Sequence, residues 1–234
     1  MADYLTYANI KSQVQALIDD SDTAIASIID SVINNVYLGD IIGEFRKGRS
    51  VPPWMVAYDA SLDTTAATRT TLVNTLGVNI ERIISVSVDN QPCLPITPEE
   101  LELHTKAGFG NPSPSFWWDT GSTMRPTRYR HRKQYTLATG GETDTFEWFP
   151  IPDTAYDIRY WYEKRVSVLS GTTVPDLPTW AHRTIIYGTL IQLAMFDVKV
   201  KAGPWAVLYE QGLEQLRGYS NNFVLGGHVE PFGI

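Results

Sequence analysis

Cysteine is nearly absent from this sequence of 234 residues, in which Cys93 is the single example. No disulfide can therefore form within the chain, and nothing indicates an oxidising or secreted environment. A chain of this length can bury a core large enough to fold without cross-links. We expect a protein that is made in the cytosol and stabilised by packing.

Long apolar runs are also scarce. The longest, IIYGTLIQLAMF from Ile185 to Phe196, is about half of the ~20 residues that a membrane-crossing helix needs. The first residues, MADYLTYANIK, have no basic stretch followed by an apolar one, so they do not resemble a signal peptide. We expect the apolar run to be a buried helix and the protein to have no membrane partner.

Charged residues make up 19% of the chain, below the roughly 25% of typical soluble domains. The net charge of −7 gives the whole chain a field that repels nucleic acid. The low charged fraction indicates that partners cover much of the surface.

Residue clusters typical of catalysis are missing too. The histidines lie in four separate segments without a second ligand type at helical spacing, and neither GFG nor ATGGET is a phosphate-binding loop. Cys93 is better explained as a small half-buried residue than as a nucleophile. We expect no enzyme activity, no cofactor and no metal. The histidines are His104, His131, His182 and His228.

Two groups of carboxylates are candidates for catalysis. Glu99, Glu100 and Glu102 begin a predicted helix, where negative charge stabilises the helix dipole. A pair from distant segments, such as Asp119 and Glu147, would suit glycoside hydrolysis, and the sequence leaves this open.

Apolar periodicity predicts helices at both ends of the chain. The spacing indicates one helix from Tyr7 to Asp19 and, after Asp22 as N-cap, another from Ile25 to Phe45. The prolines of VPPW end the second helix because proline lacks an amide donor. Near the C-terminus one helix begins near Pro178, and a last one runs from Gly203 to Gly218.

The middle of the chain has strand patterns. A β-branched run from Ile80 to Val88, the turn pair Asp89-Asn90 and a return through Cys93 and Leu94 predict a hairpin. Further predicted elements are a short helix, Pro98 to Lys106, and two strands, Arg128 to Leu137 and Thr143 to Phe149.

Alternation in YDIRYWYEKR predicts a half-buried strand. Its predicted buried face holds Tyr156, Ile158, Tyr160 and Tyr162, and its charged face holds Asp157, Arg159, Glu163 and Arg165. Trp161 is the apolar exception on the charged face, and we expect it at a subunit interface.

These elements predict an α+β fold, a helical bundle formed by the N- and C-terminal helices with an inserted antiparallel β-sheet region and an extended C-terminal arm. Residues 1–50 and 175–218 would form the bundle, residues 51–174 the β-region and residues 219–234 the arm.

The one local concentration of positive charge is RPTRYRHRKQY. Its arginines alternate, so in a strand they share one face. A solvated or subunit-contacting face is favoured, while contact with DNA or with an acidic partner stays open. The candidate contact residues are Arg128, Arg130, Arg132 and Lys133.

Four tryptophans, Trp117, Trp118, Trp148 and Trp161, have flat faces that could stack on sugars. Core or interface packing is the favoured reading. One alternative function is therefore a carbohydrate-binding module that uses surface tryptophans.

In their order along the chain, several segments resemble the head-to-tail adaptor (connector) proteins of tailed bacteriophages. After the amphipathic N-terminal helices these are VPPWMVAYD, IISVSVDNQPCLPITPEELE, GNPSPSFWWD, FEWFPIPD, YDIRYWYEKRVSVLS and LPTWAHRTIIYGTLIQLAMF. The likeness spans most of the chain, although the basic stretch and the residues after Tyr219 have no counterpart in it.

The resemblance implies a structural virion protein at the head-tail junction. Such proteins form a ring, commonly a dodecamer, with the portal protein on one side and tail or nozzle proteins on the other. Genome DNA passes through the lumen without sequence-specific binding. The arm after Tyr219 would dock on the portal through Phe223, Val224, Leu225, Val229 and Phe232.

Overall fold

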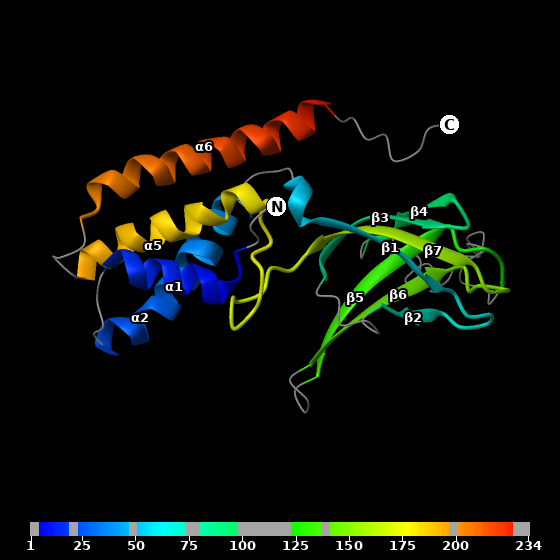
Figure 1. The fold of residues 1–234 in the computed structure, drawn as a ribbon. Helices are drawn as coiled ribbons and strands as arrows, with labels where there is room; N and C mark the ends of the chain where they lie inside the picture. Colours follow the sequence, from blue (N-terminus) through cyan, green and yellow to red (C-terminus); the bar gives the residue numbers. More distant parts are fainter. Residues whose placement is uncertain are drawn as a thin grey trace, which may run out of the picture. The chain divides into compact units, whose positions relative to one another are not determined.

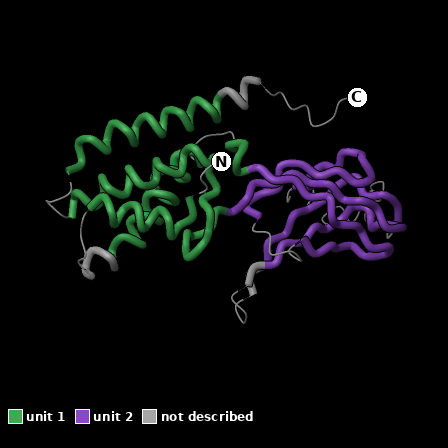
Figure 2. The backbone as a smooth tube through the Cα atoms, viewed as in Figure 1, with its two compact units in different colours: residues 1–55, 166–234 green, residues 56–165 purple. Residues whose placement is uncertain are grey.

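A computed structural model of the chain describes residues 5–18, 23–46, 51–73, 80–97, 123–136, 141–196 and 201–226. The chain divides into two compact units, coloured separately in Figure 2. A helical unit comprises Met1–Met55 and Val166–Ile234, and a sheet unit comprises Val56–Arg165.

The helical unit is built from helices of both chain ends (Figure 1). They are α1 (Tyr7–Ile18), α2 (Thr23–Asn34), the π-helix η1 (Asn35–Ile42), α3 (Gly43–Arg46), α5 (His182–Phe196) and α6 (Gly203–Gly226), with short 3-10 turns η2 (Pro53–Met55) and η4 (Thr179–Ala181).

The π-helix η1 was not predicted, because the apolar pattern from Ile25 onward was read with an α-helical period. Its buried residues form two neighbouring pairs, Val36 with Tyr37 and Ile41 with Ile42, separated by five positions. A five-residue interval matches the i→i+5 hydrogen bonding of a π-helix. The wider turn therefore keeps both pairs on the side that faces the core.

Helix α5 lies at the centre of the helical unit and contacts α1, α2, η1 and α6. Most of its residues from His182 to Leu193 are buried, as the apolar run predicted. Its last residues differ, because Met195 and Phe196 are 77% and 71% exposed.

The segment that leads from the sheet unit into α5 is held by specific hydrogen bonds. The Asn34 side chain accepts from the Leu169 amide (2.7 Å) and donates to the Leu169 carbonyl (3.2 Å). The Tyr37 hydroxyl accepts from the Asp176 amide at 2.8 Å, and the Tyr7 amide donates to Thr173 at 2.8 Å. These bonds satisfy backbone groups that would otherwise be buried without partners.

The sheet unit is a seven-stranded sheet that curls into a half-barrel, with the strand order β1-β7-β3-β4-β5-β6-β2 (Figure 1). Most neighbouring strands are antiparallel, and β4 and β5 are parallel. The strands are β1 (Val56–Asp63), β2 (Thr70–Leu72), β3 (Ile80–Val88), β4 (Gln91–Pro95), β5 (Arg128–Thr136), β6 (Gly141–Phe149) and β7 (Asp157–Lys164).

The predicted hairpin is confirmed. Asp89 and Asn90 have φ of 51° and 60°, and Val88 pairs with Gln91 across them. Positive φ at both central residues is typical of the two-residue turn whose twist matches that of the strands. Aspartate and asparagine tolerate this conformation better than other side chains that carry a Cβ.

The predicted alternation on β7 is confirmed by burial. Ile158, Tyr160 and Tyr162 are buried, whereas Asp157 and Trp161 are exposed. The buried face contributes to an aromatic core on the concave side of the sheet. In this core the Phe146 ring lies 5.6, 5.2 and 5.4 Å from the rings of Tyr129, Trp148 and Tyr160.

Glu163 departs from that alternation, since it is only 7% exposed. Its carboxylate accepts a hydrogen bond from the Arg82 Nε at 2.8 Å. Arg82 pairs with Glu163 across β3 and β7, so the strand register itself supplies the cation that a buried carboxylate needs.

The predicted fold class is wrong as stated. The structure is α+β, but the sheet is a large half-barrel of seven mixed strands rather than a small antiparallel region inserted into a helical bundle. Residues 96–127 separate β4 from β5, and a connection of this length permits parallel pairing. Strands β1 and β2 were missed because Ala, Ser and Asp in β1 are poor strand formers and β2 is only three residues long.

The predicted start of the arm is also wrong, because α6 continues through Gly218 to Gly226. A glycine inside a helix costs only about 1 kcal/mol. Burial of Leu213, Leu216 and Ser220 on the same helix outweighs that cost. The predicted N-cap Asp22 and the predicted helix from Pro98 to Lys106 lie outside the described residues.

Gly188 is a closely packed position of α5, and replacing it by alanine tests that packing. An added Cβ would lie 2.6 Å from Val36 Cγ1 and 2.7 Å from Tyr209 Cε2. We expect Gly188→Ala to destabilise the helical unit by about 1–3 kcal/mol, only partly offset by improved helix propensity. Gly218→Ala is the matched control, because its Cβ would meet nothing within 4 Å and should stabilise by up to about 1 kcal/mol. Denaturant unfolding followed by circular dichroism measures both, and equal effects would contradict the packing.

His182 predicts a pH dependence of the helical unit. It is fully buried, its Nε2–H donates to the Leu177 carbonyl at 3.0 Å, and burial lowers its pKa below the ordinary value. The folded state therefore binds fewer protons than the unfolded state, and stability falls as pH drops below about 6.5. We expect His182→Gln to show a shallower loss between pH 7.5 and pH 5.5 in unfolding of the helical unit. His131→Gln, in the sheet unit, should leave that slope unchanged, and equal slopes for wild type and His182→Gln would refute the assignment.

Candidate functional site

An exposed aromatic pair lies on the outer face of β1 and β7. Tyr58 and Trp161 are directly opposite each other in the strand register, and their ring centroids are 4.9 Å apart. They are 47% and 45% exposed. On the neighbouring strand, Ile84 lies at a register shift of β3 and is 46% exposed. Large exposed aromatic side chains that are grouped in this way are typical of protein-binding surfaces.

Two carboxylates lie at the end of the same two strands. Asp63 and Asp157 are opposite each other in the register, and both are exposed. Neither side chain forms an ion pair within the described residues. Like charges directly opposite each other on adjacent strands are destabilising. This end of the sheet therefore carries negative charge that no ion pair balances among the described residues.

The predicted arginine stripe forms on the outer face of β5. Tyr129 is buried in the concave core and His131 contacts Phe146, so the alternate residues Arg128, Arg130 and Arg132 face outward. Arg132 forms an ion pair with Glu147 at 3.6 Å. Arg128 and Arg130 have no ion pair in the part of the chain that the structure describes.

Lys133 does not share the outer face of β5. Its ammonium group donates to the backbone carbonyls of Ile80 and Glu81 at 2.6 and 2.7 Å, so it links β5 to the beginning of β3. The structure thus brings together three of the four basic candidates, and the role of that group in contacts stays a prediction.

The concave side of β5 holds a buried polar pair. His131 Nε2 lies 2.8 Å from Asp144 Oδ1, and these side chains are 16% and 4% exposed. Burial lowers the pKa of His131, and the charge of Asp144 opposes that shift. The pair satisfies two polar groups inside the sheet unit, so it is structural rather than part of the exposed surface.

Cys93 is buried, and burial raises the pKa of its thiol to about 12, although nearby Arg128 and Arg125 act in the opposite direction. The thiol is therefore protonated at neutral pH and is a poor nucleophile. This agrees with its interpretation as a small core residue.

The tryptophan candidates separate in the structure. Trp148 is fully buried, and its indole N–H donates to Thr71 Oγ1 at 2.9 Å, so it presents no face to a sugar. Trp161 keeps an exposed face. Trp117 and Trp118 lie outside the described residues. So do the candidates Glu99, Glu100, Glu102, His104, Asp119 and His228.

Within the described ranges, no group of three or more His, Cys, Asp or Glu side chains is placed to hold a metal ion. In the same part of the chain, no helix is both long and apolar enough to span a bilayer. Glu147 is one of the carboxylates that the sequence leaves open as catalytic. In the structure it forms an ion pair with Arg132.

Sequence reasoning missed Tyr58. Strand β1 has Ala, Ser or Asp at five of its eight positions, so no strand was predicted around this residue. A signal was present in the single aromatic residue of VAYDASLD, but its pairing with Trp161 depends on a strand register that sequence alone does not give.

Exposed aromatic side chains and outward-facing arginines on one sheet are typical of a protein that works through contacts with other macromolecules. A family model described as SU10 adaptor protein matches residues 5–226, which is nearly the whole chain. The chain belongs to this family of phage adaptor proteins, and the resemblance to head-to-tail adaptors is confirmed. It is therefore a structural component of a phage particle that contacts head and tail components. Among curated protein sequences, none matches the chain.

The two described tryptophans of the sheet provide a test of which aromatics are surface and which are core. We expect Trp148→Ala to cost about 3–5 kcal/mol of unfolding free energy, because it opens a large cavity and leaves Thr71 without its donor. Trp161→Ala should cost at most about 1.5 kcal/mol, the range of an exposed aromatic pair. Urea unfolding of the two variants measures the difference. Equal losses would mean that Trp161 is packed within its own subunit.

Proposed function

We propose that this phage adaptor is the head-to-tail adaptor that forms a ring beneath the portal, links the capsid vertex to the tail and surrounds the DNA channel. The observation that carries the proposal is the family match over residues 5–226. In this proposal the portal protein binds one side of the ring and tail or nozzle proteins bind the other. A dodecamer is the expected assembly.

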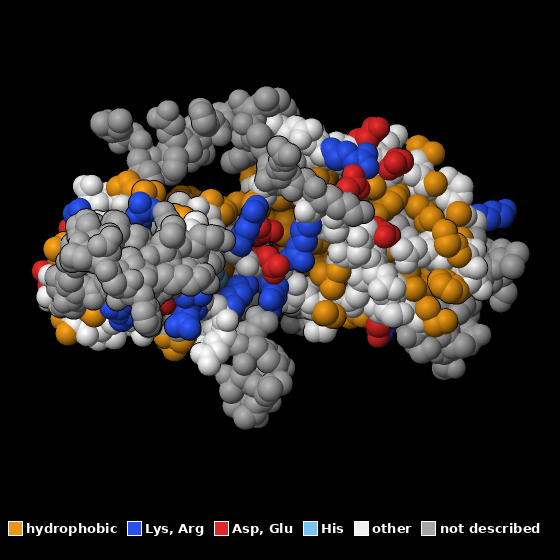
Figure 3. All heavy atoms as spheres, turned by 180° about the vertical axis from the view of Figure 1, so that it is seen from behind, with side chains coloured by type: hydrophobic (Ala, Val, Ile, Leu, Met, Phe, Trp, Pro, Cys, Tyr) orange, Lys and Arg blue, Asp and Glu red, His pale blue; other side chains and the backbone are white. Residues whose placement is uncertain are grey.

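The surface of each unit supports repeated contacts. On the helical unit, Figure 3 shows separate patches of hydrophobic side chains beside a group of acidic and basic side chains. The same unit has an aromatic row in which Trp54 stacks on Tyr219 at 5.8 Å and Trp180 meets Tyr219 at 6.0 Å. Trp180 and Tyr219 are 46% and 42% exposed. A ring subunit covers such surface with two neighbours.

The charge of the chain suits a channel for DNA. A net charge of −7 disfavours stable binding to phosphates. Acidic residues along a lumen would let the genome slide without sequence-specific binding. Charge reversal of lumen carboxylates should therefore slow DNA ejection.

The end of α6 is the proposed portal-binding segment. Phe223, Val224 and Leu225 lie in its last turns, and Val229 and Phe232 follow beyond Gly226, outside the described residues. A helix that presents apolar residues near its end can dock into a groove of a partner. The proposal therefore changes from a fully extended arm to a segment that begins within α6.

Electron microscopy of the chain mixed with the portal protein of its phage tests the function. We expect closed rings with a central channel, seated on the portal. Removal of residues 221–234 should abolish seating while the rest of the chain keeps its thermal unfolding temperature, because the remaining helical core is unchanged. Val207→Ser, on a residue of α6 that is 60% exposed, is a matched control and should still dock. Docking by the truncated chain would exclude the portal-binding segment, and absence of any ring would exclude the proposed function.

A further inference from the structure

We propose that neighbouring copies in the ring contact each other through two different faces of the sheet unit. The aromatic-acidic face, Tyr58, Trp161, Asp63 and Asp157 on β1 and β7, would bind the arginine face, Arg128, Arg130 and Arg132 on β5, of the next copy. This inference rests on the proposed ring, and its partner is a second copy of this chain.

The aromatic-acidic face has exposed rings and carboxylates that form no ion pair among the described residues, and Arg159 lies on the same face of β7 between Asp157 and Trp161. Tyr58 and Trp161 leave nearly half of their surface exposed, so the described part of the chain does not cover these two rings. Asp63 and Asp157 are opposed like charges with no ion pair among the described residues. A partner that brings cations would relieve the repulsion and cover the rings in the same contact.

The arginine face has the chemistry that this partner needs. A guanidinium group binds carboxylates through two parallel hydrogen bonds and also stacks on aromatic rings, best on tryptophan. Arg128 and Arg130 are uncompensated in the described structure, whereas Glu147 partly neutralises Arg132. One row of arginines can therefore bind both the carboxylates and the aromatic rings of the opposite face.

The two faces also match in length. Asp157 and Trp161 are four residues apart on β7, as are Arg128 and Arg132 on β5. Four residues of a strand span about 13 Å. With the strands side by side, arginines at one end of the row would reach the carboxylates while those at the other end reach the aromatic pair.

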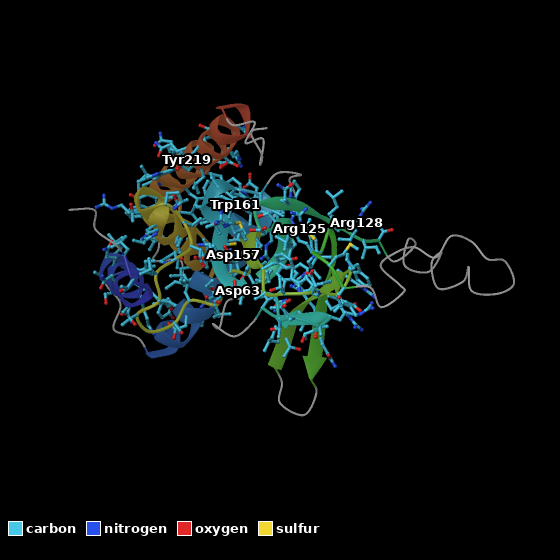
Figure 4. The ribbon with its side chains drawn as sticks, turned by 90° about the vertical axis from the view of Figure 1, so that its right-hand side faces the viewer. Asp63, Arg125, Arg128, Asp157, Trp161 and Tyr219 are labelled. Atoms are coloured by element: carbon cyan, nitrogen blue, oxygen red, sulfur yellow. The ribbon has the colours of Figure 1, made fainter. Side chains whose placement is uncertain are left out.

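The faces lie on different sides of one unit. Figure 4 shows Trp161, Asp157 and Asp63 on one side of the sheet unit and Arg128 on the opposite side. Strands β3 and β4 separate β7 from β5 in the sheet order, so hydrogen-bonded neighbours fix the distance between the faces. A contact between two unlike patches is head-to-tail, and head-to-tail contacts close into rings when the rotation permits. The arrangement therefore favours a ring over a two-fold dimer.

Charge exchange tests the contact. One variant carries Arg128→Glu and Arg130→Glu, and a second carries Asp63→Arg and Asp157→Arg. Each should lose ring formation, alone and with portal, in electron microscopy and analytical ultracentrifugation, because one face then repels its partner. A chain with all four changes, and an equal mixture of the two variants, should regain rings because opposite charges meet again. Arg183→Glu, at an exposed position of α5 in the helical unit, is the control that should keep them.

A further variant separates a lost contact from lost folding. Trp161→Ser removes the exposed indole without reversing any charge. It should raise the protein concentration that ring assembly requires at least tenfold. Thermal unfolding of every variant is compared with wild type.

The possible failures are distinguishable. If the variants form normal rings, or the four-change chain does not regain them, this interface is overturned while the ring proposal stands. Normal rings together with lost binding of double-stranded DNA would assign the arginine face to nucleic acid instead. If the wild-type chain forms no ring, even with portal, both proposals are overturned.

Discussion

The pairing of β1 with β7 is the interaction on which both units depend. Val56, the first residue of the sheet unit, pairs with Glu163, close to its last residue. This pairing holds the entry and exit of the sheet unit together, so helices from distant parts of the sequence can form one helical unit. The Arg82–Glu163 ion pair anchors the same end of β7 to β3. Without the pairing, the N- and C-terminal helices would be tethered through a long open segment, at a larger cost in chain entropy.

The same two strands also create the exposed surface that we propose for contacts between copies of the chain. Because side chains alternate along a strand, the register that buries Tyr160 and Tyr162 necessarily places Trp161 on the outer face. The register with β1 then places Tyr58 beside Trp161 and Asp63 beside Asp157. An adaptor subunit needs a stable interior and exposed contact surfaces at once, and one strand provides both in alternation. Strand β7 therefore contributes aromatic residues both to the core and to the surface.

Local patterns predicted well wherever the structure depends on neighbours in sequence. The Asp89-Asn90 turn, the strand with Ile158 and Tyr160, and the buried helix from His182 all follow from backbone preference and apolar period. Predictions failed where contacts with residues distant in the sequence determine the local structure. The π-helix η1, the parallel pairing of β4 with β5 and the weak strand β1 are stabilised by contacts that the local sequence does not encode. Gly218 illustrates the same limit, because helix packing overrides a local signal to stop.

The sequence by itself determined that the chain has α and β elements, that Cys93 forms no disulfide within the chain, that Trp161 lies opposite the core residues of its strand, and that the chain resembles phage adaptors. Only the tertiary structure decided that the sheet is a half-barrel and that Tyr58 joins Trp161. It also decided that Trp148 is buried and that Lys133 leaves the arginine face to bind backbone carbonyls. The reason is physical, since alternation and propensity act over a few residues, whereas strand register and sheet order depend on pairings between residues that are up to about a hundred positions apart in the chain.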